Sequence, residues 1–140
     1  MKNLTHLEAD VVYQLLNTPR KLWTPDVFEK KAIRRLAKQG LLVERARGLL
    51  HVTDALFDQF RVQVAKLRGV NKLLPDDDQA VLCTIRQEPE YHFVSSERRM
   101  ANRLVREGML RPANIPGRFL VTYKGYTRYN WDPIHRKPLH

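Results

Sequence analysis

Mostly basic side chains at helical spacing are the residues of this sequence that could bind another molecule. Two sets of three residues share intervals of three and four positions, which place each set on one face of a helix. They are Lys31, Arg34 and Lys38 in the first half of the chain and Arg99, Asn102 and Arg106 in the second. Arginine and lysine pair with phosphates, arginine also with guanine, and an asparagine amide with adenine. A solvated helix face without a partner has the same pattern.

Patterns typical of enzymes and metal sites are missing from the sequence. The histidines at positions 6, 51, 92, 135 and 140 lack metal-ligand spacing, and Cys83 lies in an apolar run rather than at a helix N-terminus. There is no glycine-rich phosphate loop, paired-carboxylate motif or nucleophile elbow. The aspartates at 76–78 are explained by a helix cap and a solvated linker. We expect no enzyme activity, no cofactor and no metal.

Composition favours an anionic partner. The 140 residues include 25 Lys and Arg against 15 Asp and Glu, for a net charge of +10. Residues 1–70 hold 13 bases and 7 acids and residues 71–140 hold 12 and 8, so neither half is merely a basic tail. A single cysteine excludes an internal disulfide. No apolar stretch follows the N-terminal lysine and none is long enough to span a membrane, so we expect a cytoplasmic protein without membrane contact.

Capping residues and apolar periodicity predict three helices in the first half. The first helix follows Thr5, where a capping box begins, and stops by the segment "NTPR". The second is capped by Thr24 and ends at Gly40. A β-hairpin is expected over residues 41–53, after which Thr53 opens the third helix. The second helix is expected to bury Phe28, Ile33 and Leu36, so that its basic set faces outward.

The second half predicts the same order of elements. A helix ends before Pro89, a short strand covers residues 91–94, and Ser95 or Ser96 caps a helix that ends at Gly108. A second hairpin then precedes a short helix opened by Thr122. The tail after residue 130 is expected to be irregular and held by Trp131. The best candidate linker lies between residues 69 and 75.

The two halves share a short passage of sequence. "IRRLAKQGLLV" begins at Ile33 and "ANRLVREGMLR" at Ala101, an offset of 68, and the two "VT" pairs that follow the hairpins are offset by 69. The repeat therefore spans a whole unit of helix, helix, hairpin and helix. We predict one unit over residues 1–70, a second over residues 71–130 and an irregular tail over residues 131–140.

This repeated unit resembles the winged helix-turn-helix domain of bacterial regulators. The resemblance rests on a helix ending in "RLAKQGLL" or "RLVREGML", a basic hairpin, and "VT" opening another helix. It implies a mainly α-helical α+β fold with small hairpins, built as tandem winged-helix repeats. The sequence departs from the family where the middle helix should lie, because few residues separate Asn17 from Pro25 or Gln87 from Ser95. That helix is expected to be shortened or missing.

The resemblance implies that the recognition-like helices and the hairpin tips, or wings, bind nucleic acid. Wing tips of this family lie along the backbone or in the minor groove, where arginine suits a narrow, negative environment. Asn114 in the second wing belongs with these residues, although ordinary soluble hairpins have such tips too. The predicted binding residues are Lys31, Arg34, Arg35, Lys38, Arg45, Arg47, Arg99, Asn102, Arg103, Arg106, Arg111 and Arg118.

Two apolar groups raise the question of packing or self-association. Tyr123, Tyr126 and Trp131 near the C-terminus are expected to close a small core or form a dimer contact rather than stack on bases. Phe60 and Val64 belong to a stripe on the third helix that either joins the two units or builds a homodimer.

The sequence favours a small basic protein that binds double-stranded DNA, a transcriptional regulator of a bacterium, phage or plasmid. The chief alternative is a protein-binding adaptor or inhibitor on the same scaffold, which blocks a host or regulatory protein. An exposed Tyr123, Tyr126 and Trp131 patch, with basic helices facing away from one another, would favour that alternative. RNA binding is a third hypothesis, weaker because no RNA-binding module is recognisable.

Overall fold

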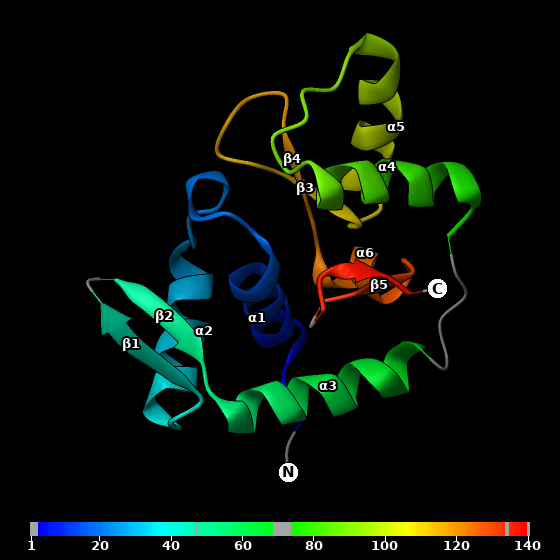
Figure 1. The fold of residues 1–140 in the computed structure, drawn as a ribbon. Coiled ribbons are helices and arrows are strands. Elements are labelled where there is room, and N and C mark those ends of the chain that lie inside the picture. The colour runs from blue at the N-terminus through cyan, green and yellow to red at the C-terminus, as the bar shows by residue number, and fades with distance from the viewer. Residues whose placement is uncertain (1–2, 47, 69–73, 134, 140) are drawn as a thin grey trace.

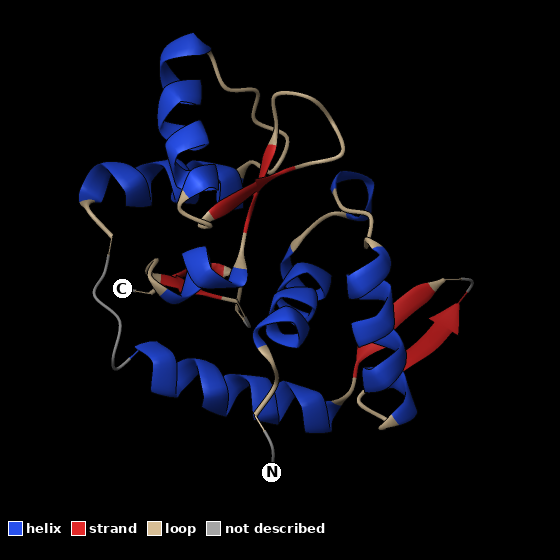
Figure 2. Ribbon diagram, turned by 180° about the vertical axis from the view of Figure 1, so that it is seen from behind, coloured by secondary structure: helices blue, strands red, loops and turns tan. Residues whose placement is uncertain are grey.

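The computed structural model describes residues 3–46, 48–68, 74–133 and 135–139, and within them the chain is α+β (Figures 1 and 2). These residues form six α-helices, a 3₁₀ helix and three two-stranded antiparallel sheets. The first half contains α1 (His6–Asn17), η1 (Arg20–Leu22), α2 (Val27–Lys38), β1 (Leu42–Ala46), β2 (Leu49–Val52) and α3 (Asp54–Arg68). The second contains α4 (Asp76–Gln87), α5 (Ser95–Arg106), β3 (Leu110–Pro112), β4 (Phe119–Val121), α6 (Tyr123–Thr127), β5 (Trp131–Asp132) and β6 (Lys137–Pro138).

The junction between helix and hairpin is built in the same way in both halves. The amide of Leu41 donates to the carbonyl of Leu36 at 2.9 Å, and the amide of Met109 donates to the carbonyl of Leu104 at 2.8 Å. The glycines before Leu41 and Met109 have φ of 74° and 81°, a left-handed conformation that glycine adopts without a steric penalty. Both helices therefore end in a Schellman-type turn, as the glycine followed by an apolar residue in each repeated passage predicts.

The end of each hairpin also repeats. The amide of Thr53 donates to the carbonyl of Leu41, and that of Thr122 to the carbonyl of Met109, both at 3.1 Å. Each threonine hydroxyl then accepts from an amide in the first turn of the next helix, Leu56 in α3 and Gly125 in α6. These bonds tie the close of the hairpin to its opening, so the duplicated sequence encodes a duplicated backbone arrangement.

The predicted cap of α2 is wrong. The N-cap is Asp26 rather than Thr24, because the Asp26 carboxylate accepts from the Glu29 amide at 2.8 Å while the Glu29 carboxylate accepts from the Asp26 amide at 3.0 Å. This reciprocal capping box satisfies two amides that helical bonding leaves free. The cap of α1 by Thr5 is confirmed.

The approach to α5 also differs from the expectation. Ser95 and Ser96 are the first helical residues rather than caps, and the helix follows Val94, whose amide donates to Glu97 at 3.0 Å. The strand expected over residues 91–94 is not formed. This segment is held instead by side chains, because the Tyr91 hydroxyl donates to the Glu97 carboxylate at 2.9 Å.

No α-helix lies between α1 and α2 or between α4 and α5, as the sequence predicts. Only the three-residue η1 lies between α1 and α2, and residues 88–94, all of them described, contain a turn but no helix. The first basic helix is therefore approached through a single 3₁₀ turn and the second through a loop.

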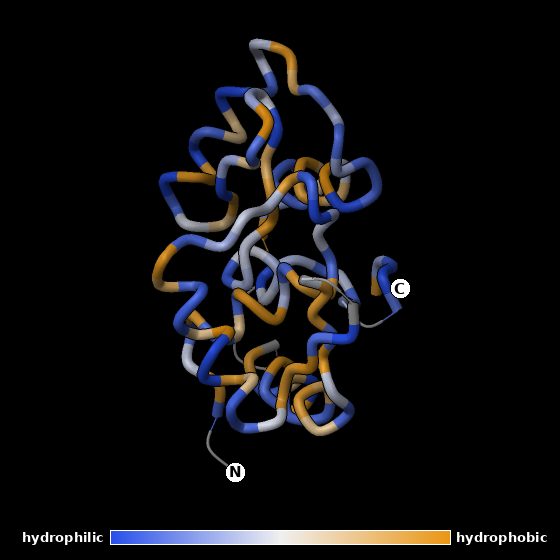
Figure 3. Tube along the Cα trace, turned by 90° about the vertical axis from the view of Figure 1, so that its left-hand side faces the viewer, coloured by the Kyte–Doolittle hydropathy of each residue, from blue (hydrophilic) through white to orange (hydrophobic). Residues whose placement is uncertain are grey.

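One main hydrophobic core is shared by the two halves. Tyr13 of α1 stacks on Tyr126 of α6 with ring centroids 4.7 Å apart, and Phe60 of α3 packs beside both Tyr123 and Tyr126. Across the same boundary the Gln14 side-chain amide donates to the Val121 carbonyl at 2.9 Å. Figure 3 shows hydrophobic residues recurring along the whole trace. The halves are thus two sequence repeats around one core, and the apolar stripe of α3 joins them.

The second hairpin, β3 and β4, packs against the first half. Leu120 lies in a smaller cluster with Leu22 and Trp23, and the Asn114 amide donates to the Leu22 carbonyl at 2.9 Å. The Asn114 side chain also donates to the Thr24 hydroxyl at 2.8 Å. This wing therefore serves as an internal contact between the two halves.

The C-terminal tail is not irregular. β5 and β6 form a small antiparallel hairpin in which Trp131 pairs with Pro138, and the Leu139 amide donates to the Asn130 carbonyl at 3.1 Å. Trp131 is 3% exposed, which confirms that it holds the tail. The predicted linker lies largely outside the described residues.

Candidate nucleic-acid interface

The outward face of α2 carries only positive charge. Five exposed cations occupy it, Lys30, Lys31, Arg34, Arg35 and Lys38, while Ala32, Leu36 and Glu29 are buried on the opposite side. Glu29 is the one acid within the helix, and it points inward to the Trp23 indole, which donates to it at 3.2 Å. The face is therefore cationic because the only carboxylate of the helix is used inside the protein.

The expectation that Phe28 would be buried is wrong. Its side chain is 67% exposed, beside an equally exposed Val27. At 100° per residue Phe28 lies about 20° around the helix axis from Arg35 and about 80° from Leu36, at the border between the cationic face and the buried side. Ile33 is partly buried and packs against both hydrophobic clusters, as predicted.

The outward face of α5 has the same character at an offset of 68 residues. Arg99, Asn102 and Arg106 are exposed, and none of them forms an ion pair with a described residue. The acid of this helix, Glu97, again faces inward, where it accepts from Tyr91. Three of the six residues predicted to bind nucleic acid in the second half, Arg99, Asn102 and Arg106, are thus displayed on one cationic face.

Two other cations of α5 have internal roles. Arg103 pairs with the buried Asp78 of α4 and with Glu107 at 3.3 Å, and the hydrogen bond that it donates to Asp78 raises the pKa of Arg103. Arg98 donates to the Phe93 carbonyl at 3.1 Å. Arg103 therefore anchors α5 on α4, and its guanidinium is less available than that of Arg99 or Arg106.

A face of like charges has a cost in the free protein. Lysines and arginines four residues apart repel one another on a helix by about 0.2–0.5 kcal/mol per pair. On α2 such pairs join Lys30 to Arg34, Arg34 to Lys38 and Lys31 to Arg35. Arg35 also has a weak contact with Glu8, at 3.8 Å, but the other four cations have no carboxylate partner among the described residues. An anionic partner would remove this repulsion.

The first hairpin is the free wing. β1 and β2 project away from the body of the protein beside α2 (Figure 1). Arg45 is exposed on this hairpin, and Arg47 lies outside the described residues. The turn is held by Arg20, whose guanidinium donates to the Gly48 carbonyl at 2.7 Å. One predicted wing arginine is thus exposed on a hairpin that lies beside α2.

The second wing does not present its arginines as the sequence predicts. Arg111 donates to both carboxylate oxygens of Glu29, at 2.9 and 3.2 Å, and to Asp10 at 3.4 Å. Arg118 is partly buried, and its backbone closes the turn of this hairpin. Arg111 of β3 is therefore an internal charge partner of α2, because it pairs with Glu29 of the α2 capping box, 82 residues away in the sequence.

Burial controls the electrostatics of this internal cluster. Burial would lower the pKa of Arg111, but its hydrogen bonds and charge contacts with Glu29 and Asp10 outweigh this and raise it. Burial raises the pKa of the Asp10 carboxyl, although the Tyr123 amide, which donates to it at 2.8 Å, and the charge of Arg111 act in the opposite direction. The cluster is thus a desolvated charge network that joins α1, α2 and β3.

Figure 1 places α2 and α5 in different parts of the molecule, α2 beside the first hairpin and α5 above α4. The structure therefore brings together Lys31, Arg34, Lys38 and the first wing, and separately Arg99, Asn102 and Arg106, but not all six helical residues. Sequence reasoning missed Lys30, although its interval of four before Arg34 signals the same face.

Neither a metal-binding cluster nor a membrane-spanning helix is found among the described residues. No group of three or more His, Cys, Asp or Glu side chains there could hold a metal ion. No helix within the same residues has the length and apolar character that a membrane span requires.

Comparisons with known proteins give no match. A scan against protein-family models, a search of curated proteins and a search of solved structures each find nothing similar to this chain.

Proposed function

We propose that this protein binds double-stranded DNA through the outward faces of α2 and α5, and that it acts as a transcriptional regulator of winged-helix type. The observation that carries the proposal is that both helices display cations without any outward-facing acid at matching positions of a repeated unit. Mixed surface charge is the usual arrangement on a solvated helix, whereas a cationic face is the electrostatic footprint of a nucleic-acid partner.

The two faces have different chemistry for the same partner. α2 offers three lysines, Lys30, Lys31 and Lys38, which are flexible point charges suited to phosphates, together with the arginines Arg34 and Arg35. α5 offers Arg99 and Arg106 beside Asn102, whose planar groups suit both phosphates and the edges of guanine and adenine. Because the helices lie in different parts of the molecule, each would contact its own segment of the duplex, and the first wing would add a backbone contact next to α2.

The alternative of a protein-binding adaptor or inhibitor loses the feature that would have favoured it. An exposed patch of Tyr123, Tyr126 and Trp131, with basic helices facing away from one another, would have favoured that hypothesis. All three side chains are at most 3% exposed and pack in the shared core. The aromatic residues are thus used for folding, and the basic faces remain the surfaces that call for a partner.

The test is the salt dependence of binding to a random duplex, measured by fluorescence anisotropy between about 50 and 200 mM salt. Each cation that neutralises a phosphate contributes about 0.9 to the slope of log K against log salt. The variant K31Q/R34Q/K38Q should therefore lower the slope by about 2.7 if all three contact phosphates. R99Q/R106Q should lower it by about 1.8.

A matched control separates a defined face from general charge. The variant K66Q/R136Q/K137Q removes the same number of positive charges, three, from exposed positions on α3 and the C-terminal hairpin. It should change the slope of log K against log salt by less than about 1. Equal losses in the control and the α2 variant would contradict the proposed faces. No duplex binding by the wild-type protein at low salt would contradict DNA binding altogether, and stronger binding to RNA than to DNA would replace the partner.

A further inference from the structure

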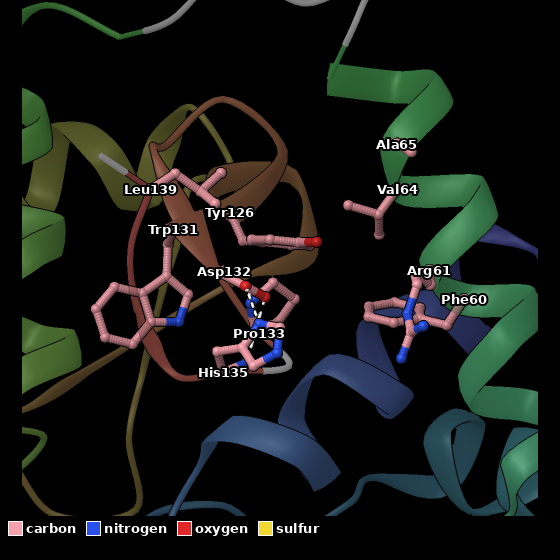
Figure 4. A pocket seen from close by; sticks show the side chains of 10 residues that line it. All are labelled: Phe60, Arg61, Val64, Ala65, Tyr126, Trp131, Asp132, Pro133, His135 and Leu139. Carbon is pink, nitrogen blue, oxygen red and sulfur yellow. Dashed lines mark hydrogen bonds and ion pairs between the residues drawn. The ribbon is translucent and has the colours of Figure 1, made fainter.

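The two most exposed large apolar side chains of the described residues lie next to one another at the start of α2. Val27 is 66% exposed and Phe28 is 67% exposed, and neither belongs to a hydrophobic cluster of the described residues. By contrast, Phe60 and Val64 of α3 line a cavity together with Tyr126 (Figure 4). The start of α2 therefore leaves apolar area in water that a partner would cover.

This apolar pair continues the cationic face of α2 toward the start of the helix. At 100° per residue, Val27 lies about 20° around the helix axis from Arg34, near the middle of the face. Phe28 lies about 20° from Arg35, at the border of the face. A partner that covers the cations of α2 would therefore cover the apolar pair as well.

The start of α2 suits base edges better than phosphates. The first cation of the helix is Lys30, and the cap before Val27 is the acid Asp26. A phosphate at this end would thus meet a carboxylate and two apolar side chains. In the major groove of a duplex, by contrast, thymine presents an apolar 5-methyl group. The duplex therefore combines negative charge for the cations with apolar groups for this end.

A second copy of the chain is a poor occupant for the same surface. Packing two copies through Val27 and Phe28 would bring two faces of five exposed cations each toward one another. Like charges repel, and the net charge of +10 on each copy opposes association further. The charge around the apolar pair thus favours an anionic partner.

The second repeated unit offers an internal comparison. At the offset of 68, Ser95 and Ser96 of α5 stand at the positions of Val27 and Phe28, and both serines are exposed. The repeated unit therefore folds without apolar residues at these positions. The two helices share a cationic face, but only α2 begins with an apolar pair, which indicates a binding role particular to α2.

We propose that Val27 and Phe28 contact the 5-methyl groups of thymine in the major groove and give α2 a preference for thymine. Such contacts rest on the proposed function, because they require that α2 binds a duplex. They supply sequence preference, which phosphate contacts do not, because the phosphates are the same at every base pair.

The experiment compares two mixed-sequence duplexes that differ only in the 5-methyl group. One contains thymine, and the other contains deoxyuridine at every thymine position, which keeps the hydrogen-bonding groups and the phosphates. Binding of the full-length protein to each duplex is measured by fluorescence anisotropy at one salt concentration. The wild type should bind the thymine duplex about fourfold more tightly for each methyl group that the contact buries.

The variant V27S/F28S gives α2 the residues that α5 has at the same positions. It should bind both duplexes equally, with the affinity of the wild type for the deoxyuridine duplex, because its cations are unchanged. The matched control is V62S, which shortens an exposed valine on α3 and should keep the preference for thymine.

The outcomes separate this preference from DNA binding itself. Equal binding of the wild type to both duplexes would overturn the thymine preference and leave DNA binding standing, whereas no binding to either duplex would refute both. A preference that persists in V27S/F28S, or an equal loss of affinity for both duplexes in that variant, would overturn the assignment to these residues. A dimer of the wild type that becomes a monomer in V27S/F28S on gel filtration would assign the apolar pair to a second copy instead.

Discussion

Replacing Arg111 by methionine should destabilise the protein, because this arginine is the charge partner of a buried carboxylate. Glu29 is 1% exposed and accepts two hydrogen bonds from Arg111, at 2.9 and 3.2 Å. Methionine keeps much of the apolar stem of the arginine but none of its donors. Glu29 would then retain only the Trp23 indole and the Asp26 amide as donors.

The magnitude follows from the burial of the two partners. Removing one member of a buried ion pair costs about 3–5 kcal/mol, because the remaining charge stays desolvated. The Arg111 side chain is 28% exposed, so water can approach the vacated position and part of the penalty is relieved. We expect a loss of about 2–3 kcal/mol in the free energy of unfolding.

The assay is urea unfolding at pH 7, followed by circular dichroism, with the slope of the transition compared between variants. R99M, at an exposed arginine of α5, is the matched control and should stay within about 0.5 kcal/mol of the wild type. The double variant R111M/E29Q removes both charges, and it should be less destabilised than the sum of the single changes by about 1–2 kcal/mol.

Either of two results would refute this account of Arg111. One is a loss in R111M no larger than that in R99M, which would mean that Glu29 does not depend on the arginine. The other is strict additivity in R111M/E29Q, which would mean that the 2.9 Å contact contributes nothing to folding.

Three further predictions concern positions where the structure sets a local constraint. Burial raises the pKa of Asp10, so the charged form of this carboxyl opposes folding above that pKa. The variant D10N should therefore be more stable than the wild type at pH 7. Urea titrations should show this gain in the free energy of unfolding becoming smaller as the pH falls toward 4. A methyl group on Gly125 would lie 2.2 Å from a backbone oxygen, so G125A should lower the free energy of unfolding by about 3 kcal/mol or more. In G40A the new methyl group meets no atom, but φ is 74°, so the loss should be about 1–2 kcal/mol. Equal melting temperatures of the two variants would contradict this ranking. T53A and T122A should each cost about 1 kcal/mol, because each threonine caps a helix and closes a hairpin, and a loss confined to one of them in thermal melts would show that the two junctions are not energetically equivalent.

Much of the fold was predictable because it depends on contacts between near neighbours in the chain. The capping box at Thr5, the glycine turns before Leu41 and Met109, and the threonine that opens α3 all involve groups within a few residues of one another. Such local patterns can be read from a single sequence, and their repetition at an offset of 68 makes the prediction stronger. The lack of an α-helix between α1 and α2 and between α4 and α5 was predictable for the same reason, since too few residues separate these helices.

The errors at helix starts show where local rules compete. Thr24 and Asp26 are both good caps, and the reciprocal bonds with Glu29 select Asp26. Before α5 the serines fit the statistical pattern of caps, yet the Glu97 carboxylate satisfies the Val94 amide instead. In both helices the residue that decides is the glutamate three positions after the cap.

The sequence by itself determined the hairpins and the cationic periodicity of α2 and α5, because these depend on residues that lie close together in the chain, and it showed the repeated unit directly as a similarity at an offset of 68. Only the tertiary structure decided which basic side chains pair with acids of the same chain. Arg103 of α5 pairs with Asp78, 25 residues away, and Arg111 of β3 pairs with Glu29, 82 residues away. The second wing is likewise used against the first half, and Trp131 is placed beside α3 to form a cavity. These outcomes depend on how two similar units pack around one core, and that packing is set by long-range contacts that local spacing does not encode.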